Sequence, residues 1–278
     1  MDRQKVAIVT GSSSGIGFET SILLARSGYV TFATMRDLRK GGLLNEISTR
    51  EKIPLEVSQL DVTDQNSVSS GIEFIFKKTG RIDILVNNAG YGLTGAFEDL
   101  SIEEIRSQYE TNFFGLIRTT QAVLPIMRAQ KSGIIINISS GLGRFGIATN
   151  SAYSSSKFAV EGLTESMSYE LEQFGIRTII IEPGIIKTNF INSSKLAHKA
   201  KDPNSPYKNF VQNSEKGISK LHESGQDPGF VAKIIKKAIE DPNPRLRYLA
   251  GKDVEQIMEI KNKLSDEDFH NMLKKMGD

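Results

Sequence analysis

Near its start the chain reads Val6-Ala-Ile-Val-Thr10-Gly11-Ser-Ser-Ser-Gly15-Ile-Gly17, a short apolar run that leads into a glycine-rich turn. Helical spacing follows at 16–26, so the turn joins a strand to a helix. A glycine turn of this kind lets the backbone approach a pyrophosphate, and the helix N-terminus adds unpaired N–H groups and partial positive charge. A tight turn without a ligand is the alternative, but its place at the first strand of an alternating pattern favours a dinucleotide cradle. The predicted cradle residues are Gly11, Ser13, Ser14, Gly15, Ile16 and Gly17.

Short apolar runs rich in valine and isoleucine alternate with longer stretches of helical spacing. These runs are Val6–Val9, Val30–Ala33, Leu55–Leu60, Ile82–Val86, Ile134–Ile138 and Thr178–Ile181. Near-continuous apolar runs are typical of strands buried on both faces, and the alternation of strand with helix predicts a parallel sheet. Right-handed crossovers then make a doubly wound α/β sheet the expected topology.

Two long helices are predicted in the middle of the chain. The first, 101–129, opens with the capping box Ser-Ile-Glu-Glu and contains Pro125, which we expect to kink or end it. The second, 154–174, is closed by Gly175.

The last third of the chain is harder to interpret. Residues 189–229 are rich in Asn, Ser, Lys, Gly and Pro, and predict an irregular insertion or lid with, at most, short helices. Ordered structure is expected to resume at 230–239, and 247–249 is a candidate last strand. Residues 252–278 predict a helical extension of two helices, the second with acidic residues early and lysines late, as the helix dipole prefers.

The composition of the 278 residues excludes several classes of function. The net charge of +2 is too small to argue for nucleic acid or an anionic membrane. The chain has no cysteine, so disulfides, thiolate metal sites and cysteine nucleophiles are excluded. With no apolar N-terminal stretch and no apolar run of about 18 residues, we expect a cytoplasmic protein without a membrane span. His198, His222 and His270 lack ligand spacing, so we expect surface residues and no metal.

The end of the second predicted strand bears on the choice of cofactor. A carboxylate there would bond the adenosine ribose and repel a 2′-phosphate, whereas Thr34 and Met35 are uncharged and Arg36 follows. A guanidinium binds phosphate bidentately, so the sequence favours NADP(H), with NAD(H) as the alternative. Asp37, 20 residues beyond Gly17, is the counterargument, and its other interpretation is a turn or capping residue. The alternative interpretation of Arg36 is a solvated surface arginine that binds no phosphate.

Polar or small residues follow two further strands. Asp61-Val62 ends the third strand, where the acid would accept a bond from an adenine amino group or cap the helix that starts near Asp64. Asn87-Asn88-Ala89-Gly90 ends the fourth, where small residues leave space for a ribose and asparagine braces the neighbouring backbone. Taken alone, the motif Asn87-Asn88-Ala89-Gly90 would indicate only a turn.

The chemical centre of the sequence is Tyr153-Ser-Ser-Ser-Lys157. Residues four apart stack on one helix face. The pKa of a tyrosine phenol is about 10, and a nearby ammonium lowers it, which makes the phenol an acid/base near neutral pH. Such a pair also occurs as a simple surface contact, so the motif alone is weak.

Two neighbouring motifs strengthen this interpretation. Ser140 follows the strand 134–138, at the edge where parallel sheets present ligands, and its hydroxyl would hold a substrate oxygen beside the phenol. The alternative for Ser140 is turn chemistry. Asn112 interrupts an apolar stretch, and a buried amide must be hydrogen-bonded. It would brace Lys157 through water or mark a helix kink.

Together these residues resemble the short-chain dehydrogenase/reductase family over about residues 5–190. The matching motifs, in the family's order and spacing, are Thr10-Gly11-(x3)-Gly15-x-Gly17, Asp61, Asn87-Asn88-Ala89-Gly90, Asn112, Ser140, Tyr153-(x3)-Lys157 and Pro183-Gly184-(x3)-Thr188. Each motif is weak alone, and together they are very specific.

The resemblance implies a single Rossmann-type domain over 1–278 with about seven parallel strands. It implies Tyr153 as acid/base and Ser140 as the anchor for the substrate oxygen. Lys157 would bond the nicotinamide ribose, and Asn112 would hold a water that relays protons. The cofactor would also contact Tyr153 and Lys157 and the set Arg36, Asp61, Val62, Asn88, Ala89, Gly90, Pro183, Gly184 and Thr188. A homodimer or homotetramer is the expected assembly.

Finer resemblance links the chain to the branch with hydroxysteroid and retinol dehydrogenases, through 34–38, 156–163 and 247–252. The sequence therefore predicts an oxidoreductase that moves a hydride between NADP(H) and a ketone or secondary alcohol, or an aldehyde or primary alcohol. An epimerase or dehydratase on the same scaffold and a non-catalytic NADP(H)-binding regulator are the alternatives. The intact Ser140, Tyr153 and Lys157 argue against the regulator.

Overall fold

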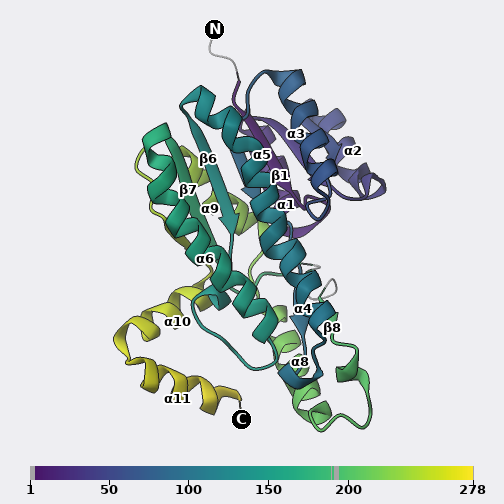
Figure 1. Cartoon of the computed structure of the whole chain (residues 1–278), viewed down its shortest axis with the longest axis vertical. Coiled ribbons are helices and arrows are strands. Elements are labelled where there is room, and N and C mark those ends of the chain that lie inside the picture. The colour runs from purple at the N-terminus through teal and green to yellow at the C-terminus, as the bar shows by residue number, and fades with distance from the viewer. Residues whose placement is uncertain (1–3, 189, 191–193, 278) are drawn as a thin grey trace.

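A seven-stranded parallel sheet forms the centre of the computed structural model, which describes residues 4–188, 190 and 194–277 (Figure 1). The strand order is β3-β2-β1-β4-β6-β7-β9, so the winding of the chain reverses between β1 and β4. The strands are β1 (Val6–Thr10), β2 (Val30–Met35), β3 (Leu55–Gln59), β4 (Ile84–Asn87), β6 (Gly133–Ile138), β7 (Ile176–Pro183) and β9 (Arg247–Ala250). The predicted doubly wound α/β fold is confirmed, including the short last strand.

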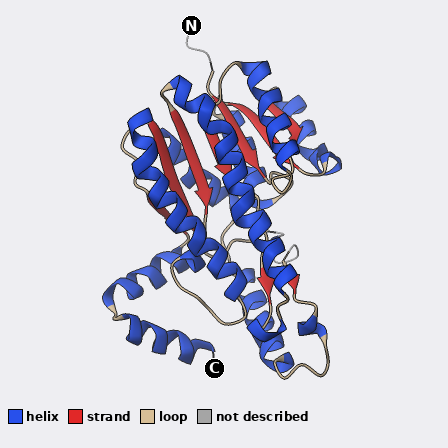
Figure 2. Ribbon diagram, viewed as in Figure 1, coloured by secondary structure: helices blue, strands red, loops and turns tan. Residues whose placement is uncertain are grey.

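Helices cover both faces of the sheet (Figure 2). The helices are α1 (Gly15–Arg26), α2 (Gly42–Glu51), α3 (Gln65–Thr79), α4 (Ile102–Tyr109), α5 (Gly115–Gln130), α6 (Ser151–Leu171), α8 (Lys208–Glu223), α9 (Pro228–Glu240), α10 (Lys252–Lys263) and α11 (Asp266–Gly277). On one face α1 and α9 pack against the central strands, and on the other α3, α5 and α6 do so. The strand arrows point toward the end of the molecule that carries α8 and α10 (Figure 1).

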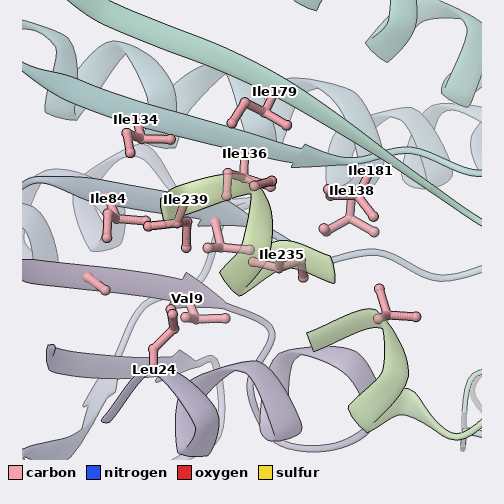
Figure 3. Packing of buried hydrophobic residues seen from close by; sticks show 14 of the residues in the cluster. Val9, Leu24, Ile84, Ile134, Ile136, Ile138, Ile179, Ile181, Ile235 and Ile239 are labelled. Carbon is pink, nitrogen blue, oxygen red and sulfur yellow. The ribbon is translucent and has the colours of Figure 1, made fainter. Parts of the chain in front are cut away.

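The core on the α1 and α9 face consists mainly of β-branched side chains from four strands (Figure 3). Ile136 of β6 and Ile179 of β7 are fully buried there and pack with Leu24 of α1 and Ile235 of α9. Because these strands are buried on both faces, they carry the near-continuous apolar runs seen in the sequence. This packing fixes the sheet edge from which the polar loops project.

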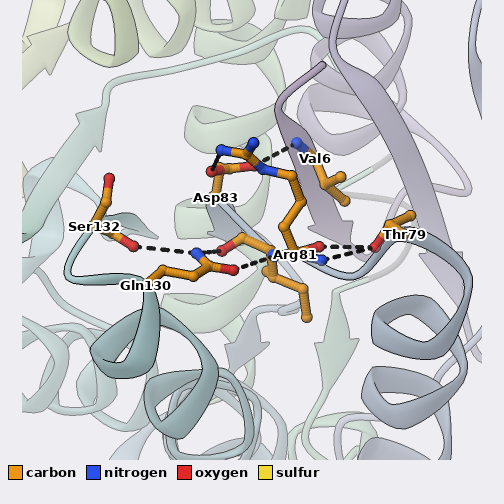
Figure 4. A network of polar contacts seen from close by, with 7 residues as sticks. Val6, Thr79, Arg81, Asp83, Gln130 and Ser132 are labelled. Carbon is orange, nitrogen blue, oxygen red and sulfur yellow. Dashed lines mark hydrogen bonds and ion pairs between the residues drawn. The ribbon is translucent and has the colours of Figure 1, made fainter. Parts of the chain in front are cut away.

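The amino ends of the strands are joined by a polar network (Figure 4). Asp83 accepts a hydrogen bond from the Val6 N–H at 2.8 Å and forms a two-pronged ion pair with Arg81 at 2.7 and 2.8 Å. The Gln130 side chain bonds both the N–H and the carbonyl of Ile82. These bonds satisfy polar groups at the amino ends of β1 and β4.

The helix predicted at 101–129 is interrupted, but not at Pro125. The capping box at its start is present, and a single wide turn of π-helix at Glu110–Phe114 separates α4 from α5. α5 continues through Pro125 to Gln130, because its buried residues Val123 and Met127 hold it against the core. Of the two outcomes predicted for Pro125, a kink or the end of the helix, the second was therefore wrong, and the irregular turn that does interrupt the helix carries Asn112.

The segment predicted as irregular contains more structure than expected. Its main element is α8, a helix of 16 residues, and β8 (Lys195–Leu196) pairs with β5 (Leu93–Thr94). A small separate core with Val211 of α8 and Ala152 of α6 holds the segment onto the domain. The sequence pattern missed α8 because its exposed face is polar and carries Gly217. Residues 189 and 191–193 of the predicted lid lie outside the described residues.

Two remaining boundaries differ slightly from prediction. The helix expected at 154–174 starts at Ser151 and ends in a tight turn at Gly175, whose φ of 69° suits glycine. Both C-terminal helices are present as α10 and α11. Within the described ranges, none of the helices has the length and apolar character needed to cross a bilayer.

Replacing Asp83 with alanine should lower the free energy of unfolding by about 2 to 3 kcal/mol, because the buried Val6 N–H and the Arg81 guanidinium lose their partner. Urea unfolding followed by circular dichroism measures this. The control is Glu73→Ala on α3, which removes an exposed i,i+4 ion pair with Lys77 and should have little effect. Equal effects of the two substitutions would contradict the structural role of the Asp83 network.

Candidate functional site

A cleft of about 680 Å³ opens at the carboxyl ends of the strands. Its wall contains most of the residues predicted from the sequence, namely Gly11, Ser13, Ser14, Gly15, Ile16, Arg36, Asp61, Val62, Asn88, Ala89, Gly90, Ser140, Tyr153, Lys157, Pro183, Gly184 and Thr188. Gly17 and Asn112 stand behind this wall, where they support it. The motifs are up to 177 residues apart in sequence, and the fold brings them to one place because the carboxyl ends of parallel strands share one edge.

The glycine turn has the shape that a phosphate cradle needs. Gly11 and Gly15 have φ values of 67° and 60°, in the left-handed region that favours glycine. A Cβ on Gly17 would collide with the Asn88 side-chain amide and lie 2.7 Å from the Gly11 carbonyl oxygen. Ser14 precedes α1 without a capping hydrogen bond from its side chain. The first N–H groups of α1 therefore remain available to an anion in the cleft, so this part of the site fits a pyrophosphate.

Asn88 and Thr10 hold the turn against the neighbouring strand. The Asn88 side-chain amide donates to the Thr10 and Gly11 carbonyls at 2.9 and 3.2 Å. The Thr10 hydroxyl accepts from the backbone N–H groups of Asn88 and Ala89 at 3.0 and 3.1 Å. The asparagine therefore braces the backbone as the sequence suggested, and the small residues beside it leave the cleft open.

Arg36 and Asp37 have different environments at the end of β2. Arg36 is exposed at the cleft, and its side chain forms no hydrogen bond or ion pair with any other residue that the structure describes. Asp37 caps the short helical turn at Leu38–Gly41 and forms a two-pronged pair with Arg39 at 2.8 and 2.9 Å. The hydrogen bond from Arg39 lowers the pKa of Asp37. The capping interpretation of Asp37 is therefore confirmed, and the Arg36 guanidinium lies at the cleft without a partner among the described residues.

Asp61 is oriented by its own loop. One carboxylate oxygen accepts from the Thr63 N–H and hydroxyl at 3.0 and 2.8 Å. The cap of α3 is Asp64, whose carboxylate accepts from the Asn66 and Ser67 N–H groups. The interpretation of Asp61 as the helix cap was therefore wrong, because the cap lies three residues later. Asp61 lines the cleft, and its other carboxylate oxygen has no hydrogen-bond partner among the described residues.

Tyr153 and Lys157 lie one turn apart near the start of α6, and Ser140 follows β6 on the facing wall. Tyr153 and Lys157 are 9% and 6% exposed, so neither is a surface residue. The Lys157 Nζ donates to the Ile138 carbonyl at 2.8 Å and lies 5.7 Å from the centre of the tyrosine ring. This burial excludes the alternative that the pair is a simple surface contact.

Burial controls the titration of both groups. It raises the pKa of the Tyr153 phenol to about 12, although a hydrogen bond with Ser140 lowers it in part. Burial also lowers the pKa of the Lys157 ammonium to about 8, although the negative charge of Glu161 acts in the opposite direction and raises it. The prediction that Lys157 lowers the pKa of the phenol was therefore wrong for this structure, because the loss of solvent around the phenol dominates and only Ser140 acts against it. At pH 7 the tyrosine is protonated and most of the lysine is charged.

Asn112 occupies the irregular turn between α4 and α5. Its amide accepts from the Tyr91 N–H at 3.0 Å and donates to the Tyr91 carbonyl at 2.9 Å. It also lies 3.4 Å from the Ser156 hydroxyl on α6. Turns of π-helix often occur at functional sites because they re-aim a side chain. Asn112 therefore positions Tyr91 and the loop after β4, and no direct bond to Lys157 is present.

Two residues outside the predicted set support the loop after β7. The His222 Nε2 accepts from the Thr188 N–H at 3.2 Å, so this histidine is a half-buried contact and not a surface residue as predicted. The Asp253 carboxylate accepts from the Ile185 N–H at 2.7 Å. His198 and His270 are exposed, as expected. No local sequence signal predicts these pairs, since 34 and 68 residues separate the partners.

The outer wall of the cleft is largely aromatic. Phe190 packs edge to face on the Tyr153 ring, with 5.8 Å between ring centres. The Lys195 Nζ lies 4.9 Å from the centre of the Tyr91 ring. Tyr91 and Lys195 were not predicted as site residues, because their roles depend on the pairing of β5 with β8.

Comparison with known proteins is consistent with this geometry. Residues 5–199 match the family model described as short chain dehydrogenase. Retinol dehydrogenase 8 of Bos taurus is 38% identical over 88% of this chain and 81% of its own length. Human 17-beta-hydroxysteroid dehydrogenase type 1 is 36% identical over 87% of this chain and 76% of its own. A solved short-chain dehydrogenase of Streptomyces avermitilis has a TM-score of 0.82 at 32% identity, covering 94% of this chain and 93% of its own.

Replacing Gly17 with alanine should weaken NAD(P)H binding at least tenfold, because the new Cβ displaces Asn88 and the turn at Gly11. Fluorescence titration measures the affinity. The matched control is Gly162→Ala in α6, a helical glycine where nothing lies within 4 Å of the new methyl group. This control should bind normally and gain up to about 1 kcal/mol of stability. Normal binding by the Gly17 variant would contradict the cradle.

Proposed function

This chain belongs to the short-chain dehydrogenase/reductase family and is an NAD(P)-dependent oxidoreductase, and on that premise we propose that it reduces ketones or aldehydes with NADPH. The observation that carries the proposal is the meeting of a buried Tyr153, Lys157 and Ser140 with the glycine cradle in one cleft. The reverse reaction is the oxidation of the corresponding alcohol.

The cofactor would lie along the cleft from Arg36 to Thr188. The free N–H groups of α1 would hold its pyrophosphate, Asp61 and Val62 its adenine, and Asn88, Ala89 and Gly90 its ribose region. Pro183, Gly184 and Thr188 line the opposite end, beside Tyr153. The bound cofactor supplies or accepts the hydride.

The protein's own part in reduction is to orient the carbonyl and to deliver a proton. Ser140 and Tyr153 donate hydrogen bonds to the carbonyl oxygen, and the Tyr153 hydroxyl gives up its proton to the nascent alkoxide. A phenol with a pKa of about 12 is fully protonated at neutral pH, yet it is a far stronger acid than the alcohol that forms. The Lys157 ammonium then stabilises the phenolate that remains. The protonated phenol is the form that the reduction requires.

Arg36 supports NADP(H) as the cofactor. Its guanidinium has no partner among the described residues, while Asp37 is occupied by Arg39 and by its capping bond. Lys40 also lines this part of the cleft. A 2′-phosphate on the adenosine ribose would therefore meet positive charge at this end.

The aromatic outer wall supports a substrate with an apolar body. Phe190 and Tyr91 line the cleft together with Tyr153, and Lys195 of β8 lines it as well. Two relatives are named for retinol and for a 17-beta-hydroxysteroid. We assign a carbonyl compound of this apolar kind to the chain as its substrate class.

Replacing Tyr153 with phenylalanine should reduce NADPH-dependent ketone turnover at least about 100-fold, because the proton donor is lost. NADPH consumption against a panel of apolar ketones and aldehydes measures the turnover, and NADPH affinity should change little. The control is Tyr169→Phe, an exposed tyrosine on the same helix, which should behave as wild type. Normal turnover by the Tyr153 variant would overturn the mechanism, and an inactive wild type the function.

Replacing Arg36 with leucine should weaken NADPH binding at least tenfold and leave NADH binding nearly unchanged, because only NADPH carries the 2′-phosphate. Affinities for both cofactors are compared by fluorescence titration. Arg50→Leu on α2, an exposed arginine outside the cleft, is the control and should change neither affinity. Equal losses for the two cofactors would refute the assignment of Arg36.

A further inference from the structure

The C-terminal extension of the chain contacts two loops of the cleft. The extension consists of α10 and α11, and it lies beyond residues 5–199, the part of the chain that matches the family model. α10 begins directly after β9, at the end of the sheet where the cleft opens (Figure 1). No described residue of the extension lines the cleft, and the mechanism proposed above does not use any of them.

Asp253, in the first turn of α10, holds the loop after β7. Its carboxylate accepts a hydrogen bond from the Ile185 N–H at 2.7 Å. Two glycines leave room for this carboxylate, because a Cβ on Gly184 would overlap it and a Cβ on Gly251 would lie 2.5 Å from its Oδ1. Gly251 also has a φ of 152°, which glycine adopts most easily. The backbone on both sides is therefore shaped around the Asp253 carboxylate.

The next residue of α10, Val254, packs on the loop after β6. Val254 is 2% exposed, and a Cβ on Gly141 would lie 2.7 Å from its Cγ2. Gly141 directly follows Ser140. Phe269 of α11 contacts the same loop further along, with 5.7 Å between its ring centre and that of Phe145. Two neighbouring residues of one helical turn therefore contact the two loops.

The two loops carry groups for the two reaction partners. The loop after β6 carries Ser140, which orients the carbonyl oxygen in the proposed function. The loop after β7 carries Gly184 and Thr188, which line the end of the cleft assigned to the nicotinamide. Hydride transfer needs its two carbon atoms in close approach, and a misplacement of about 1 Å can cost about 100-fold in rate. The reaction therefore depends on the spacing between these loops.

The loop after β7 is supported differently along its length. A backbone bridge to Gln226 holds its middle, where the Ile185 carbonyl accepts at 2.9 Å and the Lys187 N–H donates at 2.7 Å. Over 184–186, where the loop leaves the sheet, the one hydrogen bond to a side chain of a described residue is the bond to Asp253. Asp253 therefore controls the start of the loop, and α10 links that start to the loop after β6.

We propose that Asp253 is a positioning residue: by holding the start of the loop after β7 against α10, it sets the spacing between the nicotinamide end of the cleft and Ser140. The proposal rests on the proposed function, although its effect on cofactor binding is measurable without turnover. Asp253 acts through the loop, since it does not itself line the cleft.

An acidic residue in the first turn of a helix also interacts favourably with the helix dipole, so the test needs a control for that effect. Glu255 lies in the same turn, is exposed, and its side chain bonds none of the described residues. Glu255→Ala therefore removes an equal charge without affecting the loop. Because Asp253 is exposed as well, Asp253→Ala leaves no buried cavity, and both variants should unfold at nearly the same urea concentration.

The first test compares the binding of NADPH with that of 2′-phospho-ADP-ribose, which lacks the nicotinamide ring, by calorimetric titration without substrate. In Asp253→Ala the affinity for NADPH should fall at least about fivefold, because the start of the loop loses its hydrogen bond. The affinity for 2′-phospho-ADP-ribose should stay nearly unchanged, and Glu255→Ala should change neither affinity. An unchanged affinity for NADPH in Asp253→Ala, or equal losses for both ligands, would overturn the proposal.

Asp253→Asn separates the hydrogen bond from the charge. The amide oxygen of asparagine can accept from the Ile185 N–H at the same place, so this variant should bind NADPH more tightly than Asp253→Ala does. If the asparagine variant binds NADPH as weakly as the alanine variant, the hydrogen bond is not the cause, and the proposal fails.

The second test is the rate of ketone reduction in a single turnover at saturating NADPH, which separates hydride transfer from cofactor affinity. In Asp253→Ala this rate should fall at least about tenfold, because the loops are no longer held at the productive spacing, whereas Glu255→Ala should react as wild type. A wild-type rate in Asp253→Ala would contradict the positioning role. A wild-type protein that binds NADPH but reduces no ketone or aldehyde would refute the proposed function, and the binding test would still decide the role of Asp253.

Discussion

The site depends on the removal of one phenol and one ammonium from water on the same face of α6. Burial raises the pKa of the Tyr153 phenol and lowers the pKa of the Lys157 ammonium, because it disfavours the charged form of each group. The surrounding groups offset this tendency only in part, through Ser140 for the tyrosine and Glu161 for the lysine. As a result, the Tyr153 phenol is protonated at neutral pH, and the pKa of the neighbouring Lys157 lies only about one unit above neutral pH.

The sheet was predictable because the pattern of apolar residues that forms each strand is local in the sequence and repeats from strand to strand. Buried runs such as 134–138 appear in the sequence as continuous apolar residues, and glycines such as Gly175 mark the helix ends. The break between α4 and α5 was not predictable in the same way. Pro125 is a strong local signal, but the packing of Val123 and Met127 overrides it, and the wide turn at 110–114 forms where Asn112 finds partners in another loop.

The residues of the candidate site likewise fall into two groups, those in compact sequence motifs and those held by long-range contacts. Gly11, Tyr153 and Lys157 belong to compact motifs whose spacing expresses their geometry, so the sequence alone located them. The supporting contacts of His222 and Asp253 join residues far apart in the chain, and no spacing reveals them. The link from Arg247 to Glu161 spans 86 residues and exists only because β9 lies beside β7. Long-range polar contacts of this kind require the folded structure.

The most direct test of the account is the fate of the transferred hydrogen. The wild-type protein is given an apolar ketone and NADPH in which both hydrogens on the reactive carbon of the nicotinamide are deuterium, and the product is analysed by mass spectrometry and NMR. The account predicts an alcohol with one deuterium on the former carbonyl carbon. An alcohol without deuterium at that carbon, or no alcohol with any ketone or aldehyde offered, would contradict it.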